Sequence, residues 1–187
     1  MGNHLLKLVK KRGKDEMKDI PETFWELSEK DIHGNLVEFK DLKGKKVYLI
    51  VNVASACGLT NSNYRQLKKF HDKYADQGLH IMGFPCNQFK NQESKCEAEI
   101  EEILRTKFKI KFQVFSKIEV NGNNCHPLYK YLRRNSELWD EKEKKAREIP
   151  WNFAKFILNA DGKVVKFYDS GVTPNEFKDE LEAMLAE

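Results

Sequence analysis

The sequence has no run of about 18 apolar residues, so it offers no candidate for a membrane-spanning helix. Its first residues also lack the apolar stretch and small-residue cleavage site of a secretory leader, and we therefore expect a cytoplasmic protein in a reducing compartment. Cysteine is scarce, since four cysteines in 187 residues are too few and too scattered for a disulfide scaffold. Internal repeats and low-complexity segments are also missing, which argues against repeat and fibrous architectures.

A strong excess of one charge is lacking as well. Lysine and arginine number 33 against 29 acidic residues, for a net charge of +4, and no basic block is long enough to neutralise many phosphates. We therefore expect no nucleic-acid partner. The length and the 40% hydrophobic content fit one domain with a sizeable core, which we place at 19–187. Residues 1–18 are expected to form a basic, solvated tail, with weak contact to a membrane surface as the alternative.

The clearest strand pattern lies at 46–54, where an almost unbroken apolar and β-branched run is typical of a central strand that is covered on both faces. Apolar residues then recur at intervals of three and four over 61–77, which predicts a helix that ends at Gly78. Residues 79–84 form the next strand pattern. A strand–helix–strand unit of this kind places its two strands parallel, joined by a right-handed crossover.

Further elements are predicted around this unit. In chain order they are a hairpin of 24–27 with 36–39, a helix at 96–108, a strand at 112–118, a helix at 127–134, a solvated loop or exposed helix at 138–148, and a hairpin of 153–158 with 163–168. The last helix is expected to begin at Thr173 as N-cap, with Pro174 at its first position and Glu176 completing a capping box. Together these predict an α/β protein of thioredoxin-like fold, with a central mixed β-sheet flanked by helices.

Cys57 lies between the strand at 46–54 and the helix at 61–77, where chemistry in such sheets is usually located. A helix N-terminus favours the thiolate, which is the nucleophilic form of cysteine. Thr60 stands where a C-x-x-C motif would have its second cysteine, so this is not a disulfide oxidoreductase motif. A single activated cysteine suits attack on a peroxide oxygen, which produces a sulfenic acid. On position alone, a buried structural cysteine is an equally good interpretation.

Three separate segments resemble the glutathione peroxidase family. They are 52–60 around Cys57, 84–89 followed by Gln92-Glu93, and 151–153, and the similarity extends from about residue 24 to the C-terminus. The resemblance implies that Cys57 is the peroxidatic residue, in a position that some members fill with selenocysteine. It also implies that Gln92, Trp151 and Asn152 complete a catalytic tetrad. Amide and indole N–H groups are neutral donors, so they can hold a thiolate and a departing alkoxide without adding charge.

The implied activity is reduction of hydrogen peroxide and of organic or phospholipid hydroperoxides to water and alcohols. An external thiol, thioredoxin or glutathione, would restore Cys57. Members that depend on thioredoxin usually have a resolving cysteine just before a Thr-Arg-Phe-like segment, but here Arg105 precedes 106–108. Cys96, four residues after Gln92, is the candidate resolving cysteine, and direct reduction by glutathione is the alternative.

The two remaining cysteines are assigned no chemistry. Cys86 follows a buried strand and is expected to be structural, whereas Cys125 lies in a turn and is expected to be an exposed bystander. The wide spacing of the four cysteines contains no close ligand pair for zinc, so we expect neither a metal nor a bound cofactor.

The segment 129–151 is short, which resembles the monomeric branch of the family that accepts phospholipid hydroperoxides and implies a role in the response to oxidative stress. Two other functions stay open at this point. One is a thiol–disulfide exchange module, which the missing C-x-x-C motif disfavours. The other is a redox sensor, in which oxidation of Cys57 signals to a partner protein.

Overall fold

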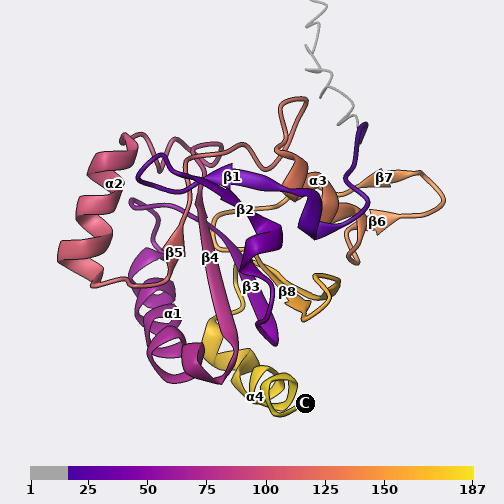
Figure 1. The fold of residues 1–187 in the computed structure, drawn as a ribbon. Helices are drawn as coiled ribbons and strands as arrows, with labels where there is room; N and C mark the ends of the chain where they lie inside the picture. The colour runs from indigo at the N-terminus through magenta and orange to yellow at the C-terminus, as the bar shows by residue number, and fades with distance from the viewer. Residues whose placement is uncertain (1–16) are drawn as a thin grey trace, which may run out of the picture.

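A five-stranded mixed sheet forms the centre of the computed structural model, which describes residues 17–187 (Figure 1). The strand order is β5-β4-β3-β8-β9. The strands are β3 (Val47–Val53), β4 (Leu79–Pro85), β5 (Gln113–Val114), β8 (Lys155–Asn159) and β9 (Val164–Tyr168). β3, β4 and β5 run parallel, while β8 runs antiparallel to β3 and β9. The predicted mixed sheet and its parallel strand–helix–strand unit are confirmed.

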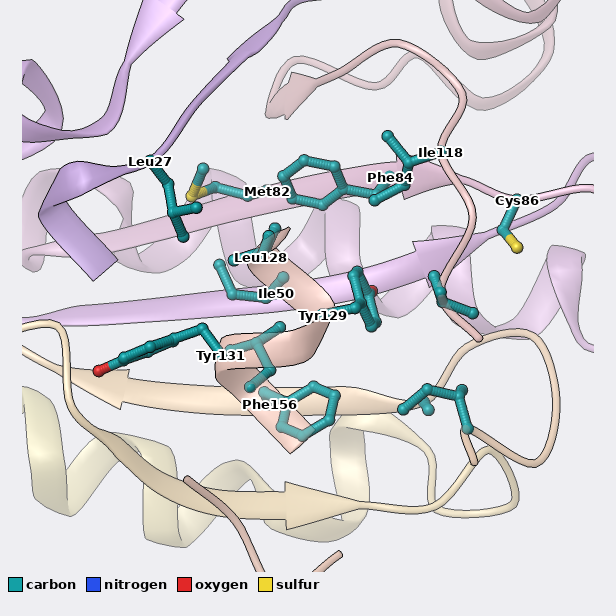
Figure 2. Close-up of a cluster of buried hydrophobic side chains, with 14 of the residues drawn as sticks. Leu27, Ile50, Met82, Phe84, Cys86, Ile118, Leu128, Tyr129, Tyr131 and Phe156 are labelled. Atoms are coloured by element: carbon teal, nitrogen blue, oxygen red, sulfur yellow. The ribbon is translucent and has the colours of Figure 1, made fainter. Parts of the chain in front are cut away.

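Every residue of β3 is buried, as the apolar run predicted. Because side chains alternate along a strand, β3 contributes to two separate cores. Tyr48 and Ile50 face one core, and Leu49 and Val51 face the other. Figure 2 shows the first core, where side chains of β3, β4 and β8 meet those of α3 (Pro127–Arg134). The second core lies under α1 (Thr60–Tyr74) and α4 (Lys178–Ala186).

Helix α1 begins at Thr60, directly after the loop that carries Cys57. It continues as a short 3-10 turn, η3 (Ala75–Gln77), and ends at Gly78, whose φ of 108° favours glycine. Added side-chain bulk at Gly78 would meet Lys46 at 2.9 Å. The chain then reverses directly into β4, as the sequence predicted.

The first hairpin forms around Gly34, but its first strand lies closer to the turn than predicted, whereas its second is only one residue shorter. They are β1 (Ser28–Lys30) and β2 (Leu36–Glu38). Residues at 24–26 form a 3-10 turn, η1 (Phe24–Glu26), and 39–42 form another, η2 (Phe39–Leu42). The rings of Phe24 and Phe39 pack 5.0 Å apart in the core, so burial of these two rings replaces strand pairing.

Three other segments also differ from their predictions. The helix predicted at 96–108 is α2 (Glu97–Ile103) followed by a π-helix, η4 (Leu104–Phe108). The strand predicted at 112–118 pairs as β5 over only two residues. The Phe115 amide still donates to Gly83 of β4, but the Ser116 amide turns to the Lys30 carbonyl of β1. The charged stretch at 138–148 forms a small hairpin of β6 (Trp139–Asp140) and β7 (Lys145–Ala146).

The predicted capping box near the C-terminus is confirmed. The backbone N–H and the hydroxyl of Thr173 both donate to the Glu176 carboxylate at 2.7 Å. These bonds begin a 3-10 turn, η5 (Pro174–Phe177), that leads into α4. Most of the basic tail predicted at 1–18 lies outside the described residues. Within residues 17–187, the helices are too short or too polar to cross a membrane.

Lys155 on β8 is fully buried, with its ammonium donating to the Val172 carbonyl at 2.5 Å. Burial lowers the pKa of Lys155 to about 8. Between pH 8 and 10.5 the unfolded chain therefore binds more protons at this residue than the folded one. The contribution of Lys155 to the free energy of unfolding rises with pH over this range.

We predict that Lys155→Met is more stable relative to the parent at pH 7.5 than at pH 10.5, because at the higher pH the parent no longer has a charged group to bury. The difference in unfolding free energy should decrease by up to about 3 kcal/mol over this range. Denaturant unfolding of both proteins at a series of pH values measures it. Burial raises the pKa of Cys86 to about 11, which makes the free energy of unfolding fall with rising pH. Cys86 is present in both proteins, so its effect cancels in the difference between variant and parent. A difference that does not change with pH would contradict the prediction.

Candidate active site

Cys57 lies at the carboxyl end of β3, immediately before α1, and is 9% exposed. Two local hydrogen bonds set the shape of its loop. The Thr60 hydroxyl accepts from the Cys57 amide at 3.2 Å and donates to the Ala54 carbonyl at 2.6 Å. The Leu59 amide donates to the Cys57 sulfur at 3.4 Å. The sulfur therefore receives a backbone donor at the start of a helix, an arrangement that favours negative charge there.

Gln92 comes from the loop that follows β4. Its carbonyl accepts a hydrogen bond from the Ala56 amide at 3.1 Å, so the backbone of this loop is joined to the residue directly before Cys57. Gln92 N–H in turn donates to the Phe89 carbonyl at 3.2 Å, which closes a tight turn. Because β3 and β4 are parallel neighbours, the loops after them leave the same edge of the sheet.

Trp151 and Asn152 arrive from the opposite direction, in the loop just before β8. The Asn52 side-chain amide, within β3, donates to the Trp151 carbonyl at 3.0 Å. The Phe153 amide donates to the Asn52 carbonyl at 2.6 Å. These two bonds fix both residues against the end of β3. Asn152 is buried and its amide nitrogen donates to the Gln92 side-chain oxygen at 3.0 Å.

The structure thus gathers all four residues of the predicted tetrad at one edge of the sheet. With the Gln92 oxygen bonded to Asn152, the Gln92 amide nitrogen is the end left to donate elsewhere. The same bond holds the Gln92 side chain against the buried Asn152. The half-buried Trp151 packs against the core that includes Cys57, and its ring lies 5.6 Å from that of Phe89.

A second link between the two loops was not predicted. The Ser55 hydroxyl donates to one carboxylate oxygen of Glu93 at 3.0 Å, and Glu93 is only 1% exposed. Its other oxygen is buried and has no partner among the described residues, as is the case for the Tyr64 hydroxyl. Burial raises the pKa of Glu93, and burial together with the nearby Glu93 charge raises that of Tyr64. The only signal in the sequence was that Glu93 directly follows Gln92.

All four cysteines are free thiols. Cys86 is buried at the end of β4 and donates to the Gln88 side-chain oxygen at 3.6 Å, which fits its predicted structural role. The prediction for Cys125 was wrong, because it is only 3% exposed and donates to the Val120 carbonyl at 3.1 Å. The turn folds back over α3, so this thiol joins the first core. Cys96 is exposed and is the N-cap of α2.

We predict opposite effects from two substitutions at the Ser55–Glu93 link. Ser55→Ala removes the hydroxyl hydrogen bond to a buried carboxylate, so it should destabilise the protein at pH 7 by about 1–3 kcal/mol. Glu93→Gln keeps an acceptor for Ser55 but removes a charge that burial disfavours. Because the pKa of Glu93 is raised, the stability of Glu93→Gln relative to the parent should increase as the pH rises above 4.5. Denaturant unfolding from pH 4 to 7 measures both effects, and a pH-independent difference for Glu93→Gln would count against the buried charge.

Comparisons with known proteins agree with this geometry. The sequence profile of a family described as "Glutathione peroxidase" matches residues 24–133. "Probable glutathione peroxidase 2" of Arabidopsis thaliana is 42% identical over 171 residues, which cover 90% of this chain and 96% of the relative. "Probable phospholipid hydroperoxide glutathione peroxidase" of Mesembryanthemum crystallinum is 44% identical over 168 residues, covering 89% and 95% respectively.

Solved structures agree as well. The structure titled "Crystal structure of Trgpx in apo form" has a TM-score of 0.68 and 32% identity, with 88% of this chain and 96% of that chain covered. A thiol:disulfide interchange protein of the thioredoxin family from Chlorobium tepidum TLS has a TM-score of 0.60 at 17% identity, with 85% and 92% covered. The second likeness concerns the fold alone and confirms the predicted thioredoxin-like arrangement. The chain belongs to the glutathione peroxidase family and is, as a member, an oxidoreductase that reduces hydroperoxides with thiols.

Proposed function

We propose that Cys57 is the nucleophile of this peroxidase. The observation that carries the assignment is the position of its sulfur, which lies at the start of α1 and accepts the Leu59 amide. The thiolate attacks the terminal oxygen of the hydroperoxide, the O–O bond breaks, and a sulfenic acid forms on Cys57. The electron pair of the O–O bond leaves on the other oxygen, which takes up a proton to give water or an alcohol.

Gln92 and Trp151 supply the donors for this step. The Gln92 amide nitrogen and the Trp151 indole N–H carry no net charge, so they can stabilise the leaving oxygen without attracting a counter-ion into the site. Asn152 is a positioning residue, because its bond to Gln92 determines which end of that amide is available.

The substrates that we propose are hydrogen peroxide and organic hydroperoxides, including those of phospholipids. Support comes from relatives that are named phospholipid hydroperoxide glutathione peroxidases and from the short segment between α3 and Trp151, which folds as the small β6–β7 hairpin. The same short segment motivates our proposal that the protein acts as a monomer. Contact of the basic tail with anionic lipid stays a prediction.

For the return of Cys57 to its thiol we propose that Cys96 attacks the sulfenic acid, forming a disulfide and releasing water, after which a thioredoxin-like protein reduces the disulfide. Cys96 is exposed and lies four residues after Gln92, whose carbonyl is joined to Ala56. A disulfide requires the two Cα atoms to approach within about 7 Å. We expect the first turn of α2 to open during this step, which would break the bond from the Cys96 amide to Glu99. Direct attack of glutathione on the sulfenic acid is the alternative.

We predict that Cys57→Ser abolishes hydroperoxide consumption while leaving the fold intact, because the hydroxyl of serine is a far weaker nucleophile than a thiolate.

Gln92→Ala should lower the rate constant of Cys57 oxidation by about 10²–10³-fold, the usual cost of losing one preorganised donor. Stopped-flow kinetics with hydrogen peroxide and circular dichroism measure activity and folding. Cys86→Ser is the matched control, since that thiol is buried in the first core, whereas Cys57 belongs to the second. A single oxidation event without sustained turnover in the parent would instead favour a redox sensor.

We further predict that one equivalent of hydroperoxide converts the reduced protein to a species lighter by two hydrogens, with a peptide crosslink between Cys57 and Cys96. In Cys96→Ser the product should instead be Cys57 with one added oxygen, because the two remaining thiols, Cys86 and Cys125, are buried in the first core. Intact-mass and peptide mass spectrometry separate the two products. If the parent also stops at the sulfenic acid, Cys96 does not resolve and an external thiol such as glutathione is the reductant.

A further inference from the structure

A lysine lies directly beside the indole that we place in the active site. The ammonium of Lys90 is 5.7 Å from the centroid of the Trp151 ring, within the range of a cation–π contact. Lys90 is exposed and sits in the loop that carries Gln92, two residues before it. No carboxylate of residues 17–187 forms an ion pair with Lys90. The positive charge is therefore available to a ligand at the rim of the site.

The backbone that carries this lysine is held in a costly conformation. Lys90 and Asn91 both have left-handed φ values, 52° and 53°. Asparagine tolerates that region, whereas lysine rarely adopts it. Strain of this kind persists only where neighbouring bonds enforce it. Here Asn87 enforces it, because its side chain accepts from the Glu93 amide at 2.9 Å and donates to the Asn91 side chain at 3.5 Å. The loop thus directs the Lys90 side chain toward Trp151.

A hollow of about 570 Å³ opens next to this pair. Phe89 and Pro150, the chain neighbours of Lys90 and Trp151, line it together with Ile149, but polar groups such as Gln88 and Asn121 make up the larger part of the lining. The one carboxylate in its lining is Glu148, which disfavours an anion inside the hollow itself. The hollow therefore offers only Phe89, Ile149 and Pro150 for apolar contact, and the anion-binding group lies outside it, at Lys90.

We propose that Lys90 is a specificity-determining residue that binds a carboxylate on the same molecule as the hydroperoxide, so that hydroperoxy fatty acids are preferred over their neutral esters. A single ammonium is a compact point charge, and it matches a monoanionic carboxylate better than a phosphate, which proteins usually bind with several donors. This inference rests on the proposed role of Cys57 and deepens it by naming the substrate class.

The test measures the oxidation of Cys57 alone, without any reductant. Reduced protein is mixed with a long-chain hydroperoxy fatty acid or with its methyl ester, each below its critical micelle concentration, and unreacted Cys57 thiol is trapped by alkylation and quantified by mass spectrometry. We expect the acid-to-ester ratio of second-order rate constants to be about three- to fivefold lower in Lys90→Gln than in the parent, the size expected of an exposed ion pair. In the parent, high salt should reduce the same ratio.

Lys109→Gln is the matched control. Lys109 is also an exposed lysine with a left-handed φ, 55°, but it ends the π-helix η4, in another part of the chain. This variant should keep the parent's acid-to-ester ratio. The proposal is overturned if Lys90→Gln keeps the parent's ratio or if Lys109→Gln lowers it equally. Hydrogen peroxide carries no carboxylate, so it should oxidise Cys57 of the parent whether or not Lys90 binds carboxylates. If it does not, the proposed role of Cys57 fails, and not only the role of Lys90.

Discussion

The pairing of β3 with a parallel strand on one side and an antiparallel strand on the other is the constraint on which the active site depends. In the register of the sheet, Val53 lies opposite Pro85 of β4, and Val51 lies opposite Lys155 of β8. The chain therefore leaves β3 and β4 and enters β8 at the same edge. Cys57, Gln92 and the Trp151–Asn152 pair are each only a few residues from that edge, so short loops bring them together.

Local bonds then determine how those loops sit, and several are made at an energetic cost. Phe153 has a left-handed φ of 65°, which is a strained conformation for an aromatic residue. Its amide is held by the Asn52 carbonyl, and its ring packs 5.5 Å from that of Tyr64. Glu93 is a carboxylate within the fold that is bonded to Ser55 through one oxygen only. Both of these costs lie beside the tetrad, where a fixed geometry matters more than stability.

Much of this arrangement could be predicted from the sequence because its signals are local. The apolar run of β3, the Thr173 capping box and the stop at Gly78 each depend on residues close in the chain, and each was confirmed. The errors concern positions decided by distant contacts. The burial of Cys125 depends on how its turn packs over α3, and the Ser55–Glu93 bond joins residues 38 positions apart. Periodicity and spacing carry no information about such pairs.

The active site combines uncharged hydrogen-bond donors around Cys57 with one positive charge, that of Lys90, at its rim. A cation close to Cys57 would stabilise its thiolate, but it would also form a lasting ion pair with that thiolate and hinder the approach of an apolar peroxide. The donor to the sulfur is instead a backbone amide, and the Gln92 and Asn152 side chains of the proposed tetrad are uncharged. The charge of Lys90 lies over the Trp151 ring on an exposed side chain. A charge in that position can select among substrates by their own charge while the reacting sulfur keeps an uncharged surrounding.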